Sequence, residues 1–259
     1  MHPLLSVKNR LRYLRLKHFE RTNAGRRIKK LKGIHQGGRC FLIGNGPSLS
    51  VSDLEKLHAN GDICFGFNRI YNIFDSTLWR PDYYLSQDHK MLAGCVEEVK
   101  AMPLPVKFVP VDLPWEHGLE LEPTHPFKML WMPKEDLSPS GFSTNAAEGV
   151  YWGSTCLYTA AQIAVYMGFS EIYLLGVDHR FQISQNNRGE IVVDNSVKDY
   201  FCDKYNEDKE KLYIPNTETS TLAYIAMKKG CEENGVRVYN ATRGGMLEVF
   251  PRVDFDSLF

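Results

Sequence analysis

The sequence predicts an α/β protein built on a doubly wound, mostly parallel β-sheet. Short apolar runs typical of buried strands alternate along the chain with stretches typical of helices, and this alternation is typical of parallel sheets. The 259 residues are 43% hydrophobic and 24% charged, which is ordinary for a protein with a buried core. No internal repeat interrupts the pattern. The length suits one large domain with a small lid.

The first expected element is a basic helix over residues 3–33, which Gly37-Gly38 ends. We therefore expect a basic helical segment over 1–36 and a nucleotide-binding catalytic domain over 37–259. The first 39 residues carry 12 Lys and Arg against one acidic residue, so the remaining residues carry 19 against 30. This asymmetry argues against a body that binds nucleic acid. Two interpretations of the segment stay open: a helix packed on the body, or a tether to anionic membrane lipid.

Six apolar runs predict strands, and three stretches between them predict helices. The strands are expected at Cys40–Ile43, Asp62–Asn68, Tyr83–Ser86, Val106–Val111, Glu171–Leu175 and Val236–Asn240. The helices are expected at Ser52–Asn60, Ser154–Met167 and Thr219–Glu233. Residues 112–150 are rich in Pro, Trp, Gly and Ser, which predicts an irregular insertion or part of a lid. The polar, poorly periodic residues 180–217 predict a mobile lid.

The loop after the first strand, Gly44-Asn45-Gly46-Pro47-Ser48, carries the strongest motif. Glycines allow a backbone to approach a ligand closely, and the amides of such a loop and of the next helix N-terminus attract phosphate. The loop matches neither G-x-G-x-x-G nor the Walker A pattern. An ordinary turn between a strand and a helix therefore remains an alternative.

Polar clusters follow the other predicted strands. They are Asn68-Arg69, Gln87-Asp88-His89 and Asp178-His179-Arg180. Ligands of open α/β sheets bind beyond the carboxyl ends of the strands, so these clusters are expected to converge on one crevice. Ser154-Thr155 before the Ala-rich helix adds an N-cap, and with it a second helix N-terminus that favours an anion.

Two histidines are candidate bases, because each has an acidic neighbour that could orient its imidazole. They are His179 beside Asp178 and His89 beside Asp88, and in both cases an ordinary loop residue is the alternative. The two aspartates could instead hold Mg²⁺ against a diphosphate. Four aromatic residues could stack on a base or a sugar, or could simply pack: Tyr200, Tyr205, Trp115 and Trp152.

The six cysteines show no C-x-x-C spacing, and several lie in apolar runs. This favours reduced thiols and argues against a structural metal. No apolar run approaches the roughly 18 residues of a membrane span, and the N-terminus lacks an apolar signal core. We therefore expect a cytoplasmic protein, with peripheral contact at the inner face of the cell membrane as an open alternative.

The loop Gly44–Leu49, Asn68 and the stretch Ser154–Asp178 resemble bacterial lipooligosaccharide sialyltransferases. This resemblance implies a Rossmann-like domain with a small lid and a CMP-activated sugar as donor. The stretch Tyr239–Gly245 is similar to the MptE-like domain, which hydroxymethylpterin diphosphokinases share with motility-associated flagellin glycosyltransferases. Together the similarity extends from about Cys40 to Gly245.

The resemblance also implies roles for individual residues. It assigns Asn45, Gly46 and Ser48, in the loop that Gly44 begins, to the donor phosphates, and Asn68 to the nucleotide or sugar. Asp88 would contact the donor, and Ser154 and Thr155 would contact the cytidine or phosphate.

One position departs from the family pattern, in which a Tyr is followed three residues later by a His. Tyr213 matches, but Asn216 stands where the His is expected. Asn cannot take a proton from an acceptor hydroxyl at neutral pH. Either another group is the base, or the reaction is a different one.

The expected function is that of a glycosyltransferase that moves a sugar from a nucleotide-sugar donor onto a cell-surface glycan or glycolipid. A CMP-nonulosonic acid such as sialic acid is the expected donor, and no cofactor is required. One alternative is an MptE-like diphosphokinase that uses ATP and Mg²⁺. The other is a non-catalytic module that binds nucleotide sugars. Nucleic acid is not expected as a partner, and homo-oligomerisation stays open.

Overall fold

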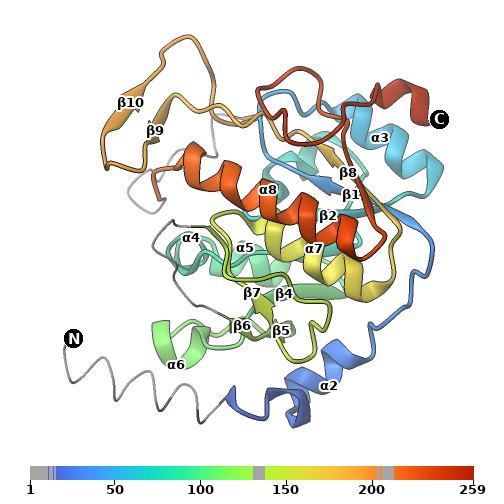
Figure 1. The fold of residues 1–259 in the computed structure, drawn as a ribbon, viewed down its shortest axis with the longest axis vertical. Helices are drawn as coiled ribbons and strands as arrows, with labels where there is room; N and C mark the ends of the chain where they lie inside the picture. The colour runs from blue at the N-terminus through green and yellow to red at the C-terminus, as the bar shows by residue number, and fades with distance from the viewer. Residues whose placement is uncertain (1–10, 12–13, 15, 131–137, 203–204, 206–212) are drawn as a thin grey trace.

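The computed structural model describes residues 11, 14, 16–130, 138–202, 205 and 213–259. Its centre is a seven-stranded sheet in the order β11-β8-β1-β2-β3-β4-β5 (Figure 1). Every neighbouring pair in this sheet is parallel. The strands are β1 (Arg39–Ile43), β2 (Ile63–Phe67), β3 (Tyr83–Leu85), β4 (Val106–Pro110), β5 (His125–Phe127), β8 (Glu171–Leu175) and β11 (Arg237–Asn240). The predicted α/β fold with a parallel, Rossmann-like sheet is confirmed.

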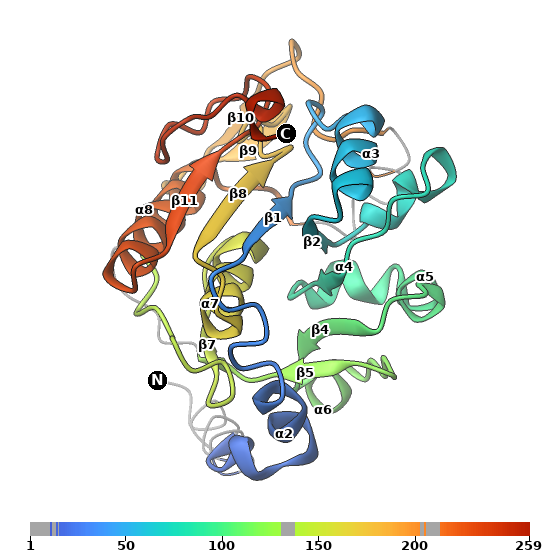
Figure 2. The same cartoon turned by 90° about the vertical axis from the view of Figure 1, so that its right-hand side faces the viewer.

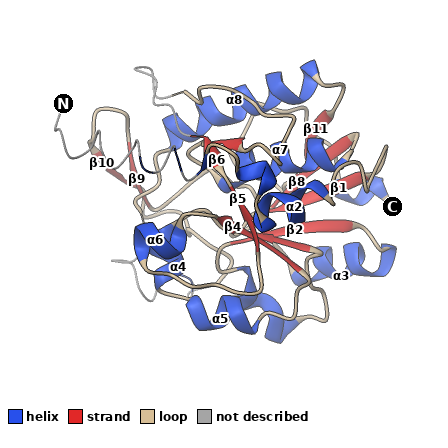
Figure 3. Cartoon of the chain, turned by 90° about the horizontal axis from the view of Figure 1, so that it is seen from below, coloured by secondary structure: helices blue, strands red, loops and turns tan. Residues whose placement is uncertain are grey.

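Helices cover both faces of the sheet. One face carries α7 (Cys156–Met167) and α8 (Thr217–Glu233), and the other carries α3 (Val51–Asn60), α4 (His89–Ala93) and α5 (Val96–Ala101) (Figures 2 and 3). The alternation of side chains along β1 divides the core accordingly. Cys40 and Leu42 belong to the cluster under α7 and α8, and Phe41 and Ile43 belong to the cluster under α3. A strand buried on both faces therefore reads as a continuous apolar run.

The strand order reverses beside β1. The chain proceeds outward from β1 through β2, β3, β4 and β5, and then returns to place β8 on the other side of β1. The loops that follow β1 and β8 leave the sheet from neighbouring strands, Ile43 being paired with Leu175. Such a reversal point is where open α/β sheets bind their ligands.

The region predicted as an irregular insertion contains ordered elements, so that prediction is wrong for part of it. Residues 112–130 form α6 (Leu113–His117), the edge strand β5 and β6 (Met129–Leu130), which pairs with β7 (Val150–Tyr151). Pro126 lies in β5 and cannot donate to a ladder, and an edge strand tolerates this. Residues 131–137 lie outside the described part of the chain.

The basic segment is not one continuous helix, contrary to the prediction. A short 3₁₀-helix, η1 (Phe19–Arg21), is followed by Thr22 in extended conformation and then by α2 (Asn23–Lys29). The Thr22 hydroxyl accepts a hydrogen bond from the Gly25 amide and so caps α2. Ile28 is buried in the main core, so α2 packs on the body. Of the predicted 3–33 helix, residues 3–10, 12–13 and 15 lie outside the described part.

The segment predicted as a lid contains an antiparallel hairpin that projects from the body in Figure 1. Its strands are β9 (Ile183–Gln185) and β10 (Ile191–Val193). The Gln185 amide donates to the Pro215 carbonyl at 2.8 Å, which ties the hairpin to the start of α8. The mobility of the segment stays a prediction, and its residues 203–204 and 206–212 lie outside the described part.

Two short 3₁₀-helices, η2 (Ile70–Ser76) and η5 (Phe255–Leu258), complete the described elements. Within these described residues, no helix is both long enough and apolar enough to cross a membrane.

Candidate functional site

A cavity of about 820 Å³ opens at the carboxyl edge of the sheet, beside the reversal point. The loops after β1, β2, β3 and β8 form its floor, and the first turns of α7 and α8 form one wall. The predicted site residues that line it are Gly44, Asn45, Gly46, Asn68, Asp88, His89, Ser154, Thr155, Asp178, His179, Tyr213 and Asn216. Ser48 is not part of this lining. The polar strand ends therefore do converge, while the roles assigned to them stay predictions.

The amides of the glycine loop are largely used within the protein. Gly44 donates to the Leu175 carbonyl at 2.7 Å, Gly46 to the Gly176 carbonyl at 2.9 Å, and Leu49 to the Gly46 carbonyl. The backbone N–H of Asn45 has no acceptor among the described residues, whereas its side-chain Nδ2 donates to the Phe67 carbonyl at 3.0 Å. A phosphate that approached this loop would therefore meet the Asn45 amide and not a full ring of amides.

The loop after β8 passes so close to Gly44 and Gly46 that neither position has room for a side chain. A Cβ at Gly44 would overlap the Gly176 carbonyl, and a Cβ at Gly46 would overlap the Asp178 carboxylate. Asp178 Oδ2 accepts hydrogen bonds from Ser48 Oγ at 2.7 Å and from the Ser48 amide at 3.3 Å. Burial raises the pKa of Asp178, and these two bonds partly offset the increase. Ser48 thus holds Asp178, which in turn lines the cavity.

Two long helices begin at the cavity. Thr155 caps α7 by accepting from the Leu157 amide, and Asn216 caps α8 by accepting from the Thr219 amide at 2.9 Å. The partial positive charge at both helix N-termini therefore faces the same space. The cap also explains the Asn at the position where the resemblance predicted a His. Ser154 Oγ is buried here without a hydrogen-bond partner among the described residues.

The hydrogen bonds of His179 define its tautomer. Its Nε2 lies 2.8 Å from Thr221 Oγ1, and that hydroxyl donates its proton to the Thr217 carbonyl. Nε2 must therefore carry a hydrogen, which leaves Nδ1 as the basic nitrogen. Nδ1 has no partner among the described residues. Burial lowers the pKa of His179, so the imidazole is neutral near pH 7.

Backbone strain also concentrates at the cavity. Among the described residues, Asn68 and His179 are the two non-glycine residues with positive φ, at 52° and 54°. Asn68 Oδ1 accepts from Ser86 Oγ at 2.9 Å, which holds its side chain at the end of β2. Left-handed backbone is uncommon outside glycine and is found more often at functional sites.

His89 lies at the other side of the cavity, in a different environment. Its ring stacks on His117 with centroids 3.8 Å apart, and Tyr213 Oη lies 3.3 Å from its Nε2. Asp88 caps α4 by accepting from the Met91 amide at 3.0 Å, and burial raises its pKa. Asp88 thus caps α4 through one oxygen, and the orienting role predicted for it toward His89 stays a prediction.

The segment after the hairpin covers the cavity with two stacked rings. Tyr200 and Tyr205 both line the cavity, and their centroids are 3.8 Å apart. The Phe201 amide donates to the Asn45 carbonyl at 3.1 Å, and Arg69 Nη1 donates to the Tyr205 carbonyl at 2.9 Å. Phe201 and Tyr205 are thus held against the loops after β1 and β2. Of the two tryptophans considered from the sequence, Trp152 lines the cavity and Trp115 does not.

Some lining residues were not predicted from the sequence. Thr219, Ser220 and Tyr224 reach the cavity from α8, and Asp199 reaches it from the lid segment. The first three follow Asn216 at intervals of three, four and eight residues, so they share a helix face. That spacing is a signal that could have found them.

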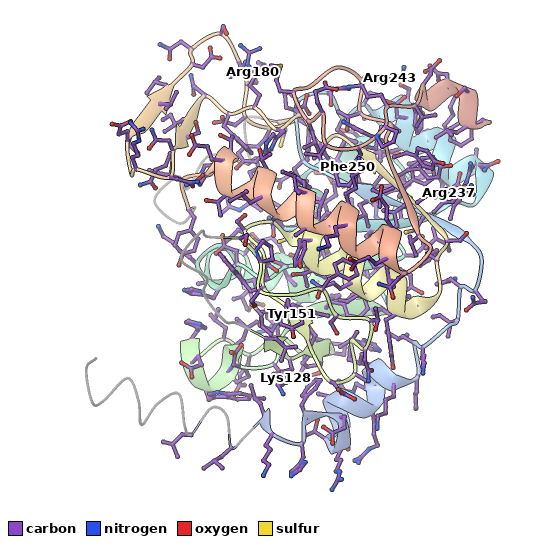
Figure 4. All side chains as sticks on the ribbon, in the orientation of Figure 1. Lys128, Tyr151, Arg180, Arg237, Arg243 and Phe250 are labelled. Atoms are coloured by element: carbon purple, nitrogen blue, oxygen red, sulfur yellow. The ribbon has the colours of Figure 1, made fainter. Side chains whose placement is uncertain are left out.

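Arg180, although it lines the cavity, directs its guanidinium to the hairpin. Its Nη2 lies 2.8 Å from Asp194 Oδ2, and Figure 4 shows Arg180 at the hairpin end of the molecule, far from Lys128 and Tyr151. No group of three or more His, Cys, Asp or Glu side chains suited to a metal occurs among the described residues. A Mg²⁺ ion here would need substrate phosphate oxygens as further ligands, as Mg²⁺ sites commonly do.

Comparison with known proteins gives a family match and distant similarity to solved structures. A model of the family described as 6-hydroxymethylpterin diphosphokinase MptE-like matches residues 15–184. Among solved structures, the MAf glycosyltransferase from Magnetospirillum magneticum AMB-1 is 16% identical with a TM-score of 0.48. The similarity covers 94% of this chain and 39% of that protein. A search of curated proteins found no significant match.

Proposed function

Because the chain belongs to the MptE-like family, we propose that it transfers a group from a nucleotide-activated substrate, and that this group is a sugar. The donor would be a nucleotide sugar such as a CMP-nonulosonic acid, and the acceptor a hydroxyl of a glycan or glycolipid. One observation carries the proposal: two helix N-termini and a neutral histidine face a single cavity at the reversal point of the sheet.

The cavity volume of about 820 Å³ is within the range of sites that enclose small molecules. The donor phosphate would lie toward the first turns of α7 and α8, where Ser154 Oγ is buried without a partner and the backbone N–H of Asn45 has no acceptor among the described residues. Tyr200 and Tyr205 would pack against the base or the sugar. Closure of the predicted lid over the donor would limit access of water.

In this mechanism His179 is the base. Its Nδ1 takes the proton of the acceptor hydroxyl, and the hydroxyl oxygen forms a bond to the anomeric carbon of the donor. The bond from that carbon to the phosphate oxygen breaks, and its electron pair stays with the phosphate, which the helix N-termini stabilise. The Nε2–H bond to Thr221 keeps the ring in the tautomer that this step needs.

A second function has specific support. The family is described by a diphosphokinase, and three carboxylates, those of Asp88, Asp178 and Asp199, line the cavity. A diphosphokinase would use ATP with Mg²⁺ and would transfer a diphosphoryl group to a small hydroxymethyl compound. In the present structure Asp88 and Asp178 each use one oxygen in an internal hydrogen bond, which favours the first proposal.

A thermal-shift screen separates the two functions. The purified protein is heated with CMP, CMP-sialic acid, UDP, ATP and AMP, each with and without Mg²⁺. The first proposal expects CMP and its sugar to raise the melting temperature without Mg²⁺. If ATP stabilises the protein only with Mg²⁺ and CMP has no effect, the diphosphokinase is the function.

Two histidine variants test the base. We expect His179→Gln to lower kcat by about 10²- to 10⁴-fold with little change in donor affinity, because Gln cannot accept the proton. His89→Gln is the matched control at the other side of the cavity, and it is expected to keep most of the activity. Equal losses of kcat in both variants would show that His179 is not the base. An unchanged amount of cellular glycan with both variants would favour a binding module without catalysis.

A further inference from the structure

We propose that the acceptor binds in a second, external groove beside His179, and that it is an amphiphile with a hydroxyl, an apolar part and an anionic group. This proposal rests on the proposed function, since it names the acceptor for the same site. The groove has a volume of about 440 Å³ and lies between α8 and residues 246–249. Its lining includes His179, which also lines the main cavity.

The walls of the groove are apolar and open to solvent. Thr221, Ile225 and Lys228 follow one another at four and three residues along α8, so they share one face of the helix. Ile225 is 52% exposed, and Met246 on the opposite wall is 62% exposed. Large apolar side chains that face each other across an open groove are suited to an aliphatic portion of a ligand.

The charge available in the groove is positive. Glu248 is neutralised by Arg252, whose Nη2 lies 2.6 Å from Glu248 Oε1, and this contact lowers the pKa of Glu248. Lys228 also lines the groove and has no ion-pair partner among the described residues. An ammonium group beside apolar walls selects an anionic headgroup, such as a phosphate, over a neutral or cationic one.

His179 connects the groove to the donor. Its imidazole lines both spaces, so an acceptor hydroxyl at the inner end of the groove would meet it where the groove adjoins the main cavity. The proton of that hydroxyl passes to Nδ1, and the oxygen attacks the donor carbon as described above. Donor and acceptor then occupy separate sites and bind together.

The test follows methyl groups by NMR in the full chain, with decyl phosphate below its critical micelle concentration as the probe. We expect the Ile225 and Met246 methyl signals to shift and saturate. Ile191 on the hairpin is the matched reporter for non-specific adsorption, because it is also 52% exposed. Its signal is expected to stay in place. Decyltrimethylammonium, with the same tail and the opposite charge, is expected to bind more weakly.

The charge variants complete the test. Lys228→Gln is expected to weaken the binding of decyl phosphate by about threefold to fivefold. Lys229→Gln, at an exposed neighbour that pairs with Glu233, is expected to leave the affinity unchanged. Saturating CMP is expected to leave unchanged the decyl phosphate concentration at which the groove signals are half shifted.

Three results would overturn the proposal: equal shifts at Ile191 and Ile225, equal affinity for the two amphiphiles, or displacement of CMP by decyl phosphate. A protein that binds decyl phosphate in the groove but fails to bind any CMP compound would overturn the proposed function alone.

Discussion

Gly46 illustrates how one residue depends on a contact that is distant in sequence. Its backbone passes so close to Asp178 that any β-carbon would overlap the carboxylate, while its φ is not in the left-handed region. Glycine is therefore required here by the neighbouring loop and not by the turn itself. The Asp178 carboxylate is then free to accept two hydrogen bonds from Ser48.

Gly46→Ala is expected to destabilise the protein by about 3 kcal/mol, since the methyl group forces the loops after β1 and β8 apart. The control is Gly61→Ala, where no atom lies within 4 Å of the added carbon and only the positive φ of 70° is strained. That change is expected to cost about 1 kcal/mol. Urea denaturation of both variants measures the difference. Equal losses would show that the two loops separate easily.

Among the elements, α7 joins the core to the cavity through one buried amide side chain. Gln162 Oε1 accepts from the amides of Ser143 and Tyr151, both at 2.9 Å. Its Nε2 donates to the carbonyls of Tyr151 and Tyr158. All the hydrogen-bonding capacity of the side chain is thus used to hold the 143–151 segment on α7, next to the cavity wall at Trp152.

Gln162→Leu keeps the volume of the side chain but leaves two partly buried amides, those of Ser143 and Tyr151, without an acceptor. We expect a loss of about 3 kcal/mol in the free energy of unfolding. Gln182→Leu is the control, because its side chain makes no hydrogen bond to a described residue. Urea denaturation of both variants measures the two losses in the free energy of unfolding. A loss below about 0.5 kcal/mol in Gln162→Leu would mean that water reaches these amides.

At the level of secondary-structure elements, the sequence predicts most of the seven-stranded sheet, because a strand buried on both faces is a continuous apolar run. Four of the six predicted strands differ from the structure by one residue at one end, Asp62–Asn68 differs by one residue at each end, and Glu171–Leu175 agrees at both ends. Strand β5 was missed, since His125-Pro126-Phe127 is short and contains a proline. The break at Thr22 was missed because the basic pattern continues across it.

The site was predictable in location but not in its hydrogen bonds. Parallel strand ends share one edge, so the convergence of Asn68, Asp88 and Asp178 follows from the fold. The use of the loop amides by Leu175 and Gly176 does not, because it depends on pairing between segments that are far apart in sequence. The capping role of Asn216 was within reach, since Asn before a helix is a common N-cap.

The N-terminal segment of the chain is basic, and the rest of the chain carries an excess of acidic residues. In the described part of the basic segment, the side chains of Lys29, Lys30 and Lys32 are exposed, and α2 itself packs on the body through Ile28. Packing and membrane contact are therefore compatible. We propose that these lysines contact anionic lipid, which would hold the enzyme near an amphiphilic acceptor.

Replacement of Lys29, Lys30 and Lys32 by Gln is expected to weaken binding to vesicles that contain phosphatidylserine by at least about tenfold, since each basic residue near such a surface contributes about 1 kcal/mol. The control removes the same charge elsewhere, at Lys100, Lys198 and Lys229. Vesicle co-sedimentation at low and high salt measures both. Equal binding by the two variants would leave the segment with a packing role only.

Three partly buried histidines make stability depend on pH. Burial lowers the pKa of His35, His125 and His179. Below about pH 6.5 the unfolded chain binds protons that the folded protein does not, so stability is lost as pH falls from that value toward the lowered folded-state pKa. Calorimetry between pH 8 and 5.5 is expected to show a constant Tm down to about 6.5 and a decline below it. A Tm that rises through this range would contradict the burial of these rings.

The position of β1 between β2 and β8 also bears on the order of synthesis. β2 follows β1 closely in the chain and can pair with one edge of β1 early in synthesis. The other edge of β1 is paired only after β8 (Glu171–Leu175) has been synthesised. A nascent chain that has not yet reached residue 171 therefore presents an apolar strand with an open edge, which is a template for association with other chains. We expect ribosome-bound intermediates of this protein to depend on a chaperone until the second half has emerged.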